Sequence, residues 1–146
     1  MKWLLRLDGE ALQYILLFEA TTGIEAKDCV VYEDTVIFII PEGKIGRAMG
    51  RKGEKIKKLK IKIGRSIRII EFSPNPEQFL LNFFKPYGAR RAKIEQQGGK
   101  VFAVVEVPVG NKAKAIGLGA KNIKIARYVF NRYYKLDGIY IEAHVG

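Results

Sequence analysis

The sequence contains an internal repeat. A shift of 67 residues places Pro41 on Pro108 and Gly50 on Gly117, so that IIPEGKIGRAMGRKGEKIK aligns with EVPVGNKAKAIGLGAKNIK. Self-similarity at one fixed spacing indicates that the same structural unit is built twice. A chain of 146 residues has room for two very small domains. We therefore expect two similar domains in tandem.

The midpoint of the chain carries its strongest break in secondary structure. The stretch SPNP, residues 73–76, contains two prolines, and each disfavours a helical conformation in the residue before it. Asn75 is also a good helix N-cap, and Pro76 directly after it suits the first helical position. We expect the first domain over residues 1–73 and the second over residues 74–146.

Both halves show the same order of predicted elements. Each begins with an amphipathic helix, one capped by Asp8 and one by Asn75, and continues with two short strands around a tight turn. A short helix, a glycine loop, a longer helix and a last strand follow. The order helix-strand-strand-helix-helix-strand in each half predicts an α+β fold.

Particular residues define these elements. The inward positions of the two opening helices are Leu12, Ile15, Leu16 and Glu19 in one half and Phe79, Leu80, Phe83 and Phe84 in the other. The expected strands cover residues 28–32, 35–41, 66–72, 91–97, 100–108 and 138–145. The longer helices begin near Glu54 and Lys121; the first ends at Gly64 and the second continues to Tyr134.

Positive charge is concentrated around the two glycine loops. Residues 43–70 contain 11 basic residues and one acid, and residues 110–135 contain 7 basic residues and no acid, within a chain of formal charge +11. One lysine-rich run is ordinarily a solvated helix face. Two matching runs favour a polyanionic partner, either nucleic acid or an anionic membrane surface. Glycine allows the backbone N–H groups to approach a phosphate closely, and the start of the next helix adds a favourable dipole.

The first loop, Gly50-Arg51-Lys52-Gly53, resembles the GxxG loop of a KH domain, and the order of elements matches the type II form. The stretch 117–120 occupies the same place in the second half. With IGRAMGRKGEKI and AKAIGLGAKNIKIARY in tandem, the chain resembles the NusA family, in particular its short archaeal members, over nearly its whole length. The resemblance implies two tandem type II KH domains that bind single-stranded RNA, with the loop on the RNA backbone and the bases in a narrow groove.

The resemblance also implies roles for individual residues. Gly50 and Gly53 are expected to permit close approach and Arg51 and Lys52 to contact phosphate. The other RNA-binding positions are Lys44, Arg47 and Lys55 in the first domain and Lys112, Lys114, Gly117, Leu118, Gly119, Ala120, Lys121 and Asn122 in the second. Because Leu118 has no charge and Ala120 replaces a glycine, the second loop is expected to bind phosphate more weakly or through its backbone alone. Ile45, Met49 and Ile56 are expected in the groove or the core.

No catalytic or metal site is expected. The chain contains neither GxxxxGK[ST] nor GxGxxG, and its one histidine, His144, has no zinc-type spacing to its one cysteine, Cys29. No nucleophile and base pair stands out, so we expect neither an enzyme nor a cofactor. A single cysteine fits a reducing compartment, and the longest apolar runs, such as residues 36–40, have the length of strands. We therefore expect a cytoplasmic protein without a membrane span.

The NusA resemblance implies a factor in transcription elongation or termination that binds single-stranded RNA, with RNA polymerase as a further candidate partner. One alternative remains open, because type II KH domains also occur in a small-subunit ribosomal protein and in ribosome-assembly GTPases. The chain could then be a ribosome-associated KH protein that binds ribosomal RNA. Co-purification with RNA polymerase or with ribosomal particles distinguishes the two.

Overall fold

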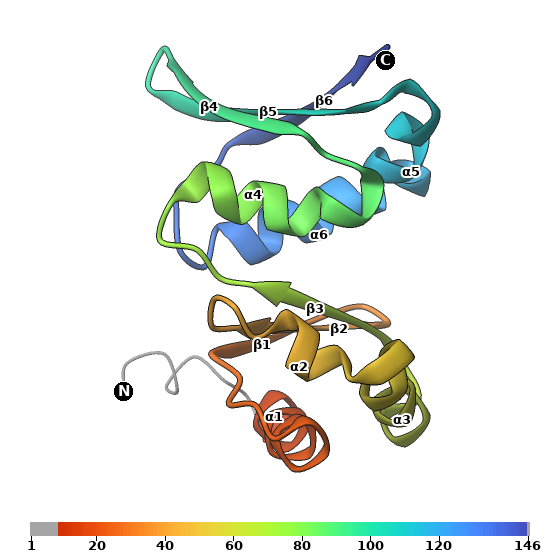
Figure 1. The fold of residues 1–146 in the computed structure, drawn as a ribbon. Helices are drawn as coiled ribbons and strands as arrows, with labels where there is room; N and C mark the ends of the chain where they lie inside the picture. Colours follow the sequence, from red (N-terminus) through yellow and green to blue (C-terminus); the bar gives the residue numbers. More distant parts are fainter. Residues whose placement is uncertain (1–8, 146) are drawn as a thin grey trace. The chain divides into compact units, whose positions relative to one another are not determined.

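The structure is a computed structural model that describes residues 9–145 (Figure 1). Contacts between residues divide the chain into two compact units, Met1–Phe72 and Ser73–Gly146. Each unit has its own three-stranded sheet and its own three α-helices among the described residues.

The first unit contains, in order, α1 (Gly9–Thr22), β1 (Asp28–Tyr32), β2 (Thr35–Ile40), α2 (Ile45–Met49), α3 (Glu54–Ile63) and β3 (Ser66–Glu71). Its sheet has the order β1-β2-β3, with β1 antiparallel and β3 parallel to β2. All three helices lie on one face of this sheet (Figure 1). The α3 helix ends, as predicted, at Gly64, which has a left-handed conformation and donates its N–H to Lys60 O.

The second unit contains α4 (Pro76–Phe84), β4 (Arg91–Gln97), β5 (Lys100–Pro108), α5 (Lys112–Ile116), α6 (Lys121–Phe130) and β6 (Gly138–His144). The sheet order is β4-β5-β6, again with one antiparallel and one parallel pairing. The α+β fold with helix-strand-strand-helix-helix-strand in each unit is confirmed. Parallel pairing of the last strand with the middle one places the two helices that flank each glycine loop in the crossover between them.

The core of the first unit lies between β2 and the helices. Val36, Phe38 and Ile40 alternate along β2 and therefore point to the same face of the sheet. The ring of Phe18 from α1 stacks on Phe38 with 4.5 Å between centroids. Leu59 is the only residue of α3 that is fully buried in this core. The α3 helix thus turns one apolar stripe inward, as its sequence predicts. Its lysines are exposed at positions 57, 58, 60 and 62, whereas Lys55 is half-buried.

The face predicted for α1 is wrong in part. Leu12 and Leu16 are 45% and 60% exposed, whereas Ile15 is buried. The buried positions of α1 are Ala11, Ile15, Phe18 and Thr22. Apolar residues surround most of this helix, so spacing alone did not identify the buried face, and the large ring of Phe18 faces the core. The predicted cap, Asp8, lies outside the described residues.

Aromatic side chains pack together in the second unit. Phe79 of α4 stacks on Phe130 of α6, with 6.0 Å between centroids, and meets Tyr133 edge-on at 5.6 Å. All four apolar residues predicted to face inward on α4 are buried. Asn75 caps this helix as predicted, because its side chain accepts hydrogen bonds from Glu77 N and Gln78 N at 3.0 and 3.3 Å.

The second long helix ends earlier than the sequence predicts. α6 stops at Phe130, not at Tyr134, because the Asn131 side chain closes the chain into a turn. Asn131 Nδ2 donates to Leu136 O at 3.0 Å, and Leu136 N donates to Asn131 Oδ1 at 2.7 Å. Tyr134 lies beyond the helix and donates its hydroxyl to Pro74 O at 2.9 Å. Burial raises the pKa of the Tyr134 phenol above its usual value.

Candidate nucleic-acid interface

The first residue of each loop has a backbone that requires glycine. Gly50 has φ 78° and ψ 175°, and Gly117 has φ 83° and ψ 159°. This region is essentially limited to glycine. A Cβ at Gly50 would lie 2.8 Å from Lys55 Cγ, and a Cβ at Gly117 would lie 2.6 Å from Asn122 N. The close approach at these two positions is made by the chain's own next helix.

The third and fourth residues of the two loops share a left-handed conformation although their side chains differ. Lys52 has φ 54° and ψ 28°, and Gly119 has φ 62° and ψ 26°. Gly53 has φ 70° and ψ 22°, and Ala120 has φ 60° and ψ 24°. Each loop therefore holds one residue with a side chain in a conformation that costs it roughly 1–2 kcal/mol. The second loop keeps the backbone shape of the first despite its different glycine pattern.

The hydrogen bond inside each loop joins the N–H group of its last residue to the carbonyl oxygen of its first. Gly53 N donates to Gly50 O at 3.2 Å, and Ala120 N donates to Gly117 O at 3.0 Å. The N–H groups of residues 51 and 52, and of residues 118 and 119, take no part in these loop hydrogen bonds. Two adjacent N–H groups at an exposed turn next to a helix start form a site that suits a phosphate oxygen.

The predicted cationic side chains surround the first loop unevenly. Arg51 and Lys52 are exposed beside the unused N–H groups, Arg47 is exposed on α2, and Lys44 is half-buried. Of the cations predicted to bind RNA in the second unit, Lys112 and Lys114 on α5 are exposed, whereas Lys121 at the start of α6 is half-buried. Leu118 is 97% exposed and adds no charge to its loop. The first loop therefore carries charge at its tip, and the second carries charge only on its flanks.

Two of the predicted RNA-binding side chains already have partners inside their own unit. Lys55 Nζ donates to Arg47 O at 3.0 Å and to Thr22 O at 3.1 Å. Asn122 is 8% exposed, and its Nδ2 donates to Ala115 O at 2.7 Å. The sequence shows only that both halves have a polar residue two positions after the loop. It does not show where these side chains point.

Another interaction at the loop helices was missed from sequence. Glu71, at the end of β3, accepts a hydrogen bond from Ile45 N at 3.0 Å, which satisfies an N–H group at the start of α2. Ile45 and Ile56 pack against the core of the first unit while keeping part of their surface exposed, and Met49 is also half-buried. Of these three positions, expected in the groove or the core, Ile45 and Ile56 are therefore packed on the core with part of their surface exposed.

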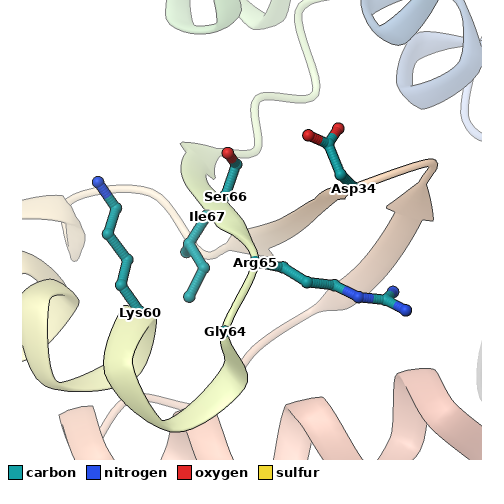
Figure 2. A pocket seen from close by; sticks show the side chains of 6 residues that line it. All are labelled: Asp34, Lys60, Gly64, Arg65, Ser66 and Ile67. Carbon is teal, nitrogen blue, oxygen red and sulfur yellow. The ribbon is translucent and has the colours of Figure 1, made fainter.

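A pocket near the end of α3 does not form a binding site. It is lined by Asp34, Lys60, Gly64, Arg65, Ser66 and Ile67. Figure 2 shows the side chains of Asp34, Lys60 and Arg65 pointing in different directions instead of converging on one point. Arg65 is already engaged, because its Nη1 lies 2.6 Å from Glu10 Oε1. The cations of this pocket therefore do not define a ligand position.

Residues 9–145 contain neither a metal-site cluster nor a membrane-spanning helix. No group of three or more His, Cys, Asp or Glu side chains with the geometry of a metal site occurs in that range. None of the helices there has both the length and the apolar composition to cross a membrane.

Comparisons with known proteins agree with this arrangement. The KH domain family matches residues 13–74. The "Probable transcription termination protein NusA" of Halobacterium salinarum is 32% identical over 92% of this chain and 96% of its own length. The protein of the same name from Thermoplasma acidophilum is 31% identical over 92% of this chain and 94% of its own. The crystal structure of APE1850 superposes with a TM-score of 0.77 at 33% identity, covering 93% of this chain and all of that one.

The extent of these matches decides the family. The KH match includes the first glycine loop, and the two archaeal relatives align across both units and both loops. The resemblance inferred from the repeated glycine loops is thus confirmed by relatives at 31–32% identity over almost their whole length. This chain, with its two tandem KH domains, belongs to the archaeal NusA-like family of KH-domain proteins.

Proposed function

We propose that this protein binds single-stranded RNA through its two glycine loops and acts as a NusA-type factor in transcription elongation or termination. The observation that carries the proposal is the shared backbone of the loops, each with two N–H groups outside the loop's own hydrogen bonds. A phosphate can be held by such N–H groups whatever the side chains are. A second loop without a charged tip can then still bind the RNA backbone.

The two loops contact the RNA in different ways. Arg51 and Lys52 add charge-assisted contacts to the first loop, which makes the first domain the electrostatic anchor. The second loop binds the continuing RNA strand through the backbone of Gly117, Leu118, Gly119 and Ala120, with Lys112, Lys114 and Lys121 on the flanks. Lys44 and Arg47 follow the strand beside the first loop. The apolar surface that Ile45 and Ile56 leave exposed is available to the bases.

The role in transcription rests on the curated relatives, whose names describe transcription termination. It includes RNA polymerase as a partner and a place in the cytoplasm, and it involves no catalysis by this chain. The domains in this proposal are residues 1–73 and 74–146. The names of the relatives favour transcription over the ribosome-associated alternative.

RNA binding is tested first. A labelled single-stranded RNA long enough to reach both domains is titrated at several salt concentrations, and a duplex of the same sequence serves as control. If about four to six phosphates are neutralised, the slope of log K against log[salt] should be roughly −3 to −4. The duplex should bind more weakly, because its stacked bases cannot enter a groove. A slope near zero, or equal affinity for both forms, contradicts the proposal.

The role in transcription needs its own test. RNA polymerase from the same cells transcribes a template with a terminator, with and without this protein, and full-length and terminated products are compared. The proposal predicts that the ratio of these products changes and that the variant Arg51→Asp/Lys52→Asp has a smaller effect. Normal RNA binding with an unchanged product ratio would leave an RNA-binding protein without the proposed role in transcription.

A further inference from the structure

Lys55 and Asn122 occupy the same place in the repeat and do the same thing by different chemistry. Each lies two residues beyond its loop, in the first turn of the following helix, and each donates to a backbone carbonyl of the helix before the loop. The acceptors are Arg47 O in α2 and Ala115 O in α5. Each side chain therefore bridges the two helices across the base of its loop.

These bridges satisfy groups that a helix leaves unpaired. The last carbonyls of a helix have no partner within it. Because α2 and α5 have only five residues each, most of their carbonyl groups have no hydrogen-bond partner within the helix. Lys55 satisfies one in α2 and also the carbonyl of Thr22 at the end of α1, at 3.1 Å. One ammonium group thus joins the ends of two helices to the start of α3.

The side-chain stems also explain the first glycine of each loop. A Cβ at Gly50 would lie 2.8 Å from Cγ and 3.2 Å from Cδ of Lys55, so the lysine stem covers this glycine. In the second unit a Cβ at Gly117 would lie 3.0 Å from Asn122 Cβ. The glycine lets the bridging side chain cross close to the loop, and the bridge holds the loop on the other side.

We propose that Lys55 and Asn122 are positioning residues: they fix the two glycine loops in the conformation that presents the free N–H groups, and they do not themselves hold phosphate. This inference rests on the proposed RNA binding and deepens it. A loop already fixed in the bound shape loses less conformational freedom when RNA binds, which increases affinity. Lys55 then supports binding through the loop backbone, not through its charge.

Two replacements with the same change in charge separate the two roles of Lys55. Lys55→Met keeps an apolar stem over Gly50 but cannot donate a hydrogen bond. Lys55→Asn introduces the side chain that makes the bridge in the second unit, where Asn122 reaches Ala115 O. Lys58→Met, on the exposed side of the same helix, controls for the loss of one charge.

The proposal predicts that Lys55→Met weakens RNA binding about three- to tenfold more than Lys58→Met, because loop residues must then be ordered on binding. Lys55→Asn should bind RNA like Lys58→Met. The slope of log K against log[salt] should be the same for the Met and Asn variants at position 55. Suppose instead that Lys55→Met and Lys55→Asn lose affinity equally and that their slope is smaller than that of wild type by about 0.7, the value for one phosphate contact. Lys55 then contacts RNA directly and the proposal is wrong.

A second readout does not depend on RNA. In the free protein, ¹⁵N relaxation of the amides of Arg51 and Lys52 should show greater mobility in Lys55→Met than in wild type, Lys55→Asn or Lys58→Met. Asn122→Ala, which changes no charge, should increase the mobility of the amides of Leu118 and Gly119 in the same way. If Lys55→Met fails to fold, this variant alone tests whether the bridging side chain restrains its loop. Unchanged loop mobility in these variants overturns the positioning role. If wild type binds no RNA while the mobility changes as predicted, the proposed function fails and the positioning role stands.

Discussion

Lys52 and Gly119 hold the same left-handed backbone conformation at the third position of their loops, with φ and ψ within 8° of each other. The cost of that conformation is carried by different positions in the two loops. In the first loop Lys52 has the side chain and the next residue is glycine. In the second loop Gly119 is free of strain and Ala120 has the side chain. The two loops thus reach one shape from two sequences.

The first prediction concerns the strain at Ala120. Ala120→Gly should raise the free energy of unfolding by up to about 1 kcal/mol, because the left-handed cost of alanine, roughly 1–2 kcal/mol, exceeds or matches the entropy cost of glycine. Ala113→Gly, at an exposed position of α5 with ordinary helical backbone, is the control and should lower it by about 0.5–1 kcal/mol. Urea unfolding measures both. If Ala120→Gly is no more stable than Ala113→Gly, the left-handed backbone of Ala120 does not carry the assigned strain.

The second prediction compares the first glycines of the two loops. Gly117→Ala should destabilise by about 1–3 kcal/mol or more, because a new Cβ meets a backbone nitrogen that cannot move. Gly50→Ala should cost less, since its neighbour is the flexible stem of Lys55. Gly46→Ala, at a helical position with open space around it, should be neutral or stabilising. Thermal unfolding of the three variants measures their stability. If Gly50→Ala destabilises the protein more than Gly117→Ala, the explanation by the neighbouring atoms is wrong.

The third prediction concerns charge at the tip of the first loop. Arg51→Asp/Lys52→Asp should weaken binding to single-stranded RNA by about tenfold or more and flatten the salt slope by about 1.4, the value for two phosphate contacts. Folding should be unaffected, because both side chains are exposed and aspartate tolerates the left-handed conformation at position 52.

A matched control makes the same charge change elsewhere. Lys60→Asp/Lys62→Asp replaces two exposed lysines near the far end of α3. If the loop is the anchor, this variant should lose distinctly less affinity than the loop variant at equal salt, with both proteins folded by circular dichroism. Equal losses would mean that overall charge, not the loop, attracts the RNA.

The fourth prediction concerns the uncharged second loop. Leu118→Lys should leave RNA affinity unchanged or raise it, because Leu118 is 97% exposed, so its removal costs no packing, and lysine adds a charge beside the unused N–H groups. Folding should be as in wild type. Loss of RNA binding in a folded Leu118→Lys protein would show that the leucine itself contacts RNA and that the backbone role assigned to this loop is wrong.

Local signals in the sequence predicted the fold well. The cap at Asn75, the helix stop at Gly64 and the hairpin turns depend on a few adjacent residues, and each forms as expected. Repetition supplied the rest, since a pattern seen twice at one spacing is unlikely to arise from chance local composition.

What the sequence did not reveal depends on contacts between distant residues. The buried face of α1 is set by Phe18 stacking on Phe38, and α6 ends early because Asn131 bonds to Leu136. At the candidate site, polar residues such as Lys55 and Asn122 are indistinguishable from surface residues until the carbonyls they reach are known. The conformation of Ala120 was likewise not evident, because alanine gives no sequence signal for left-handed backbone.

The most direct test of RNA binding by the two glycine loops is a titration of the ¹⁵N-labelled protein with single-stranded RNA, followed by NMR of the backbone amides. If both loops hold phosphates of one RNA, the largest shifts should occur at the amides of Arg51, Lys52, Leu118 and Gly119, and these shifts should saturate at the same RNA concentration. Duplex RNA should produce smaller shifts at these four amides. Large shifts confined to other surfaces, with the four loop amides unmoved at saturation, would contradict the claim that the glycine loops bind RNA.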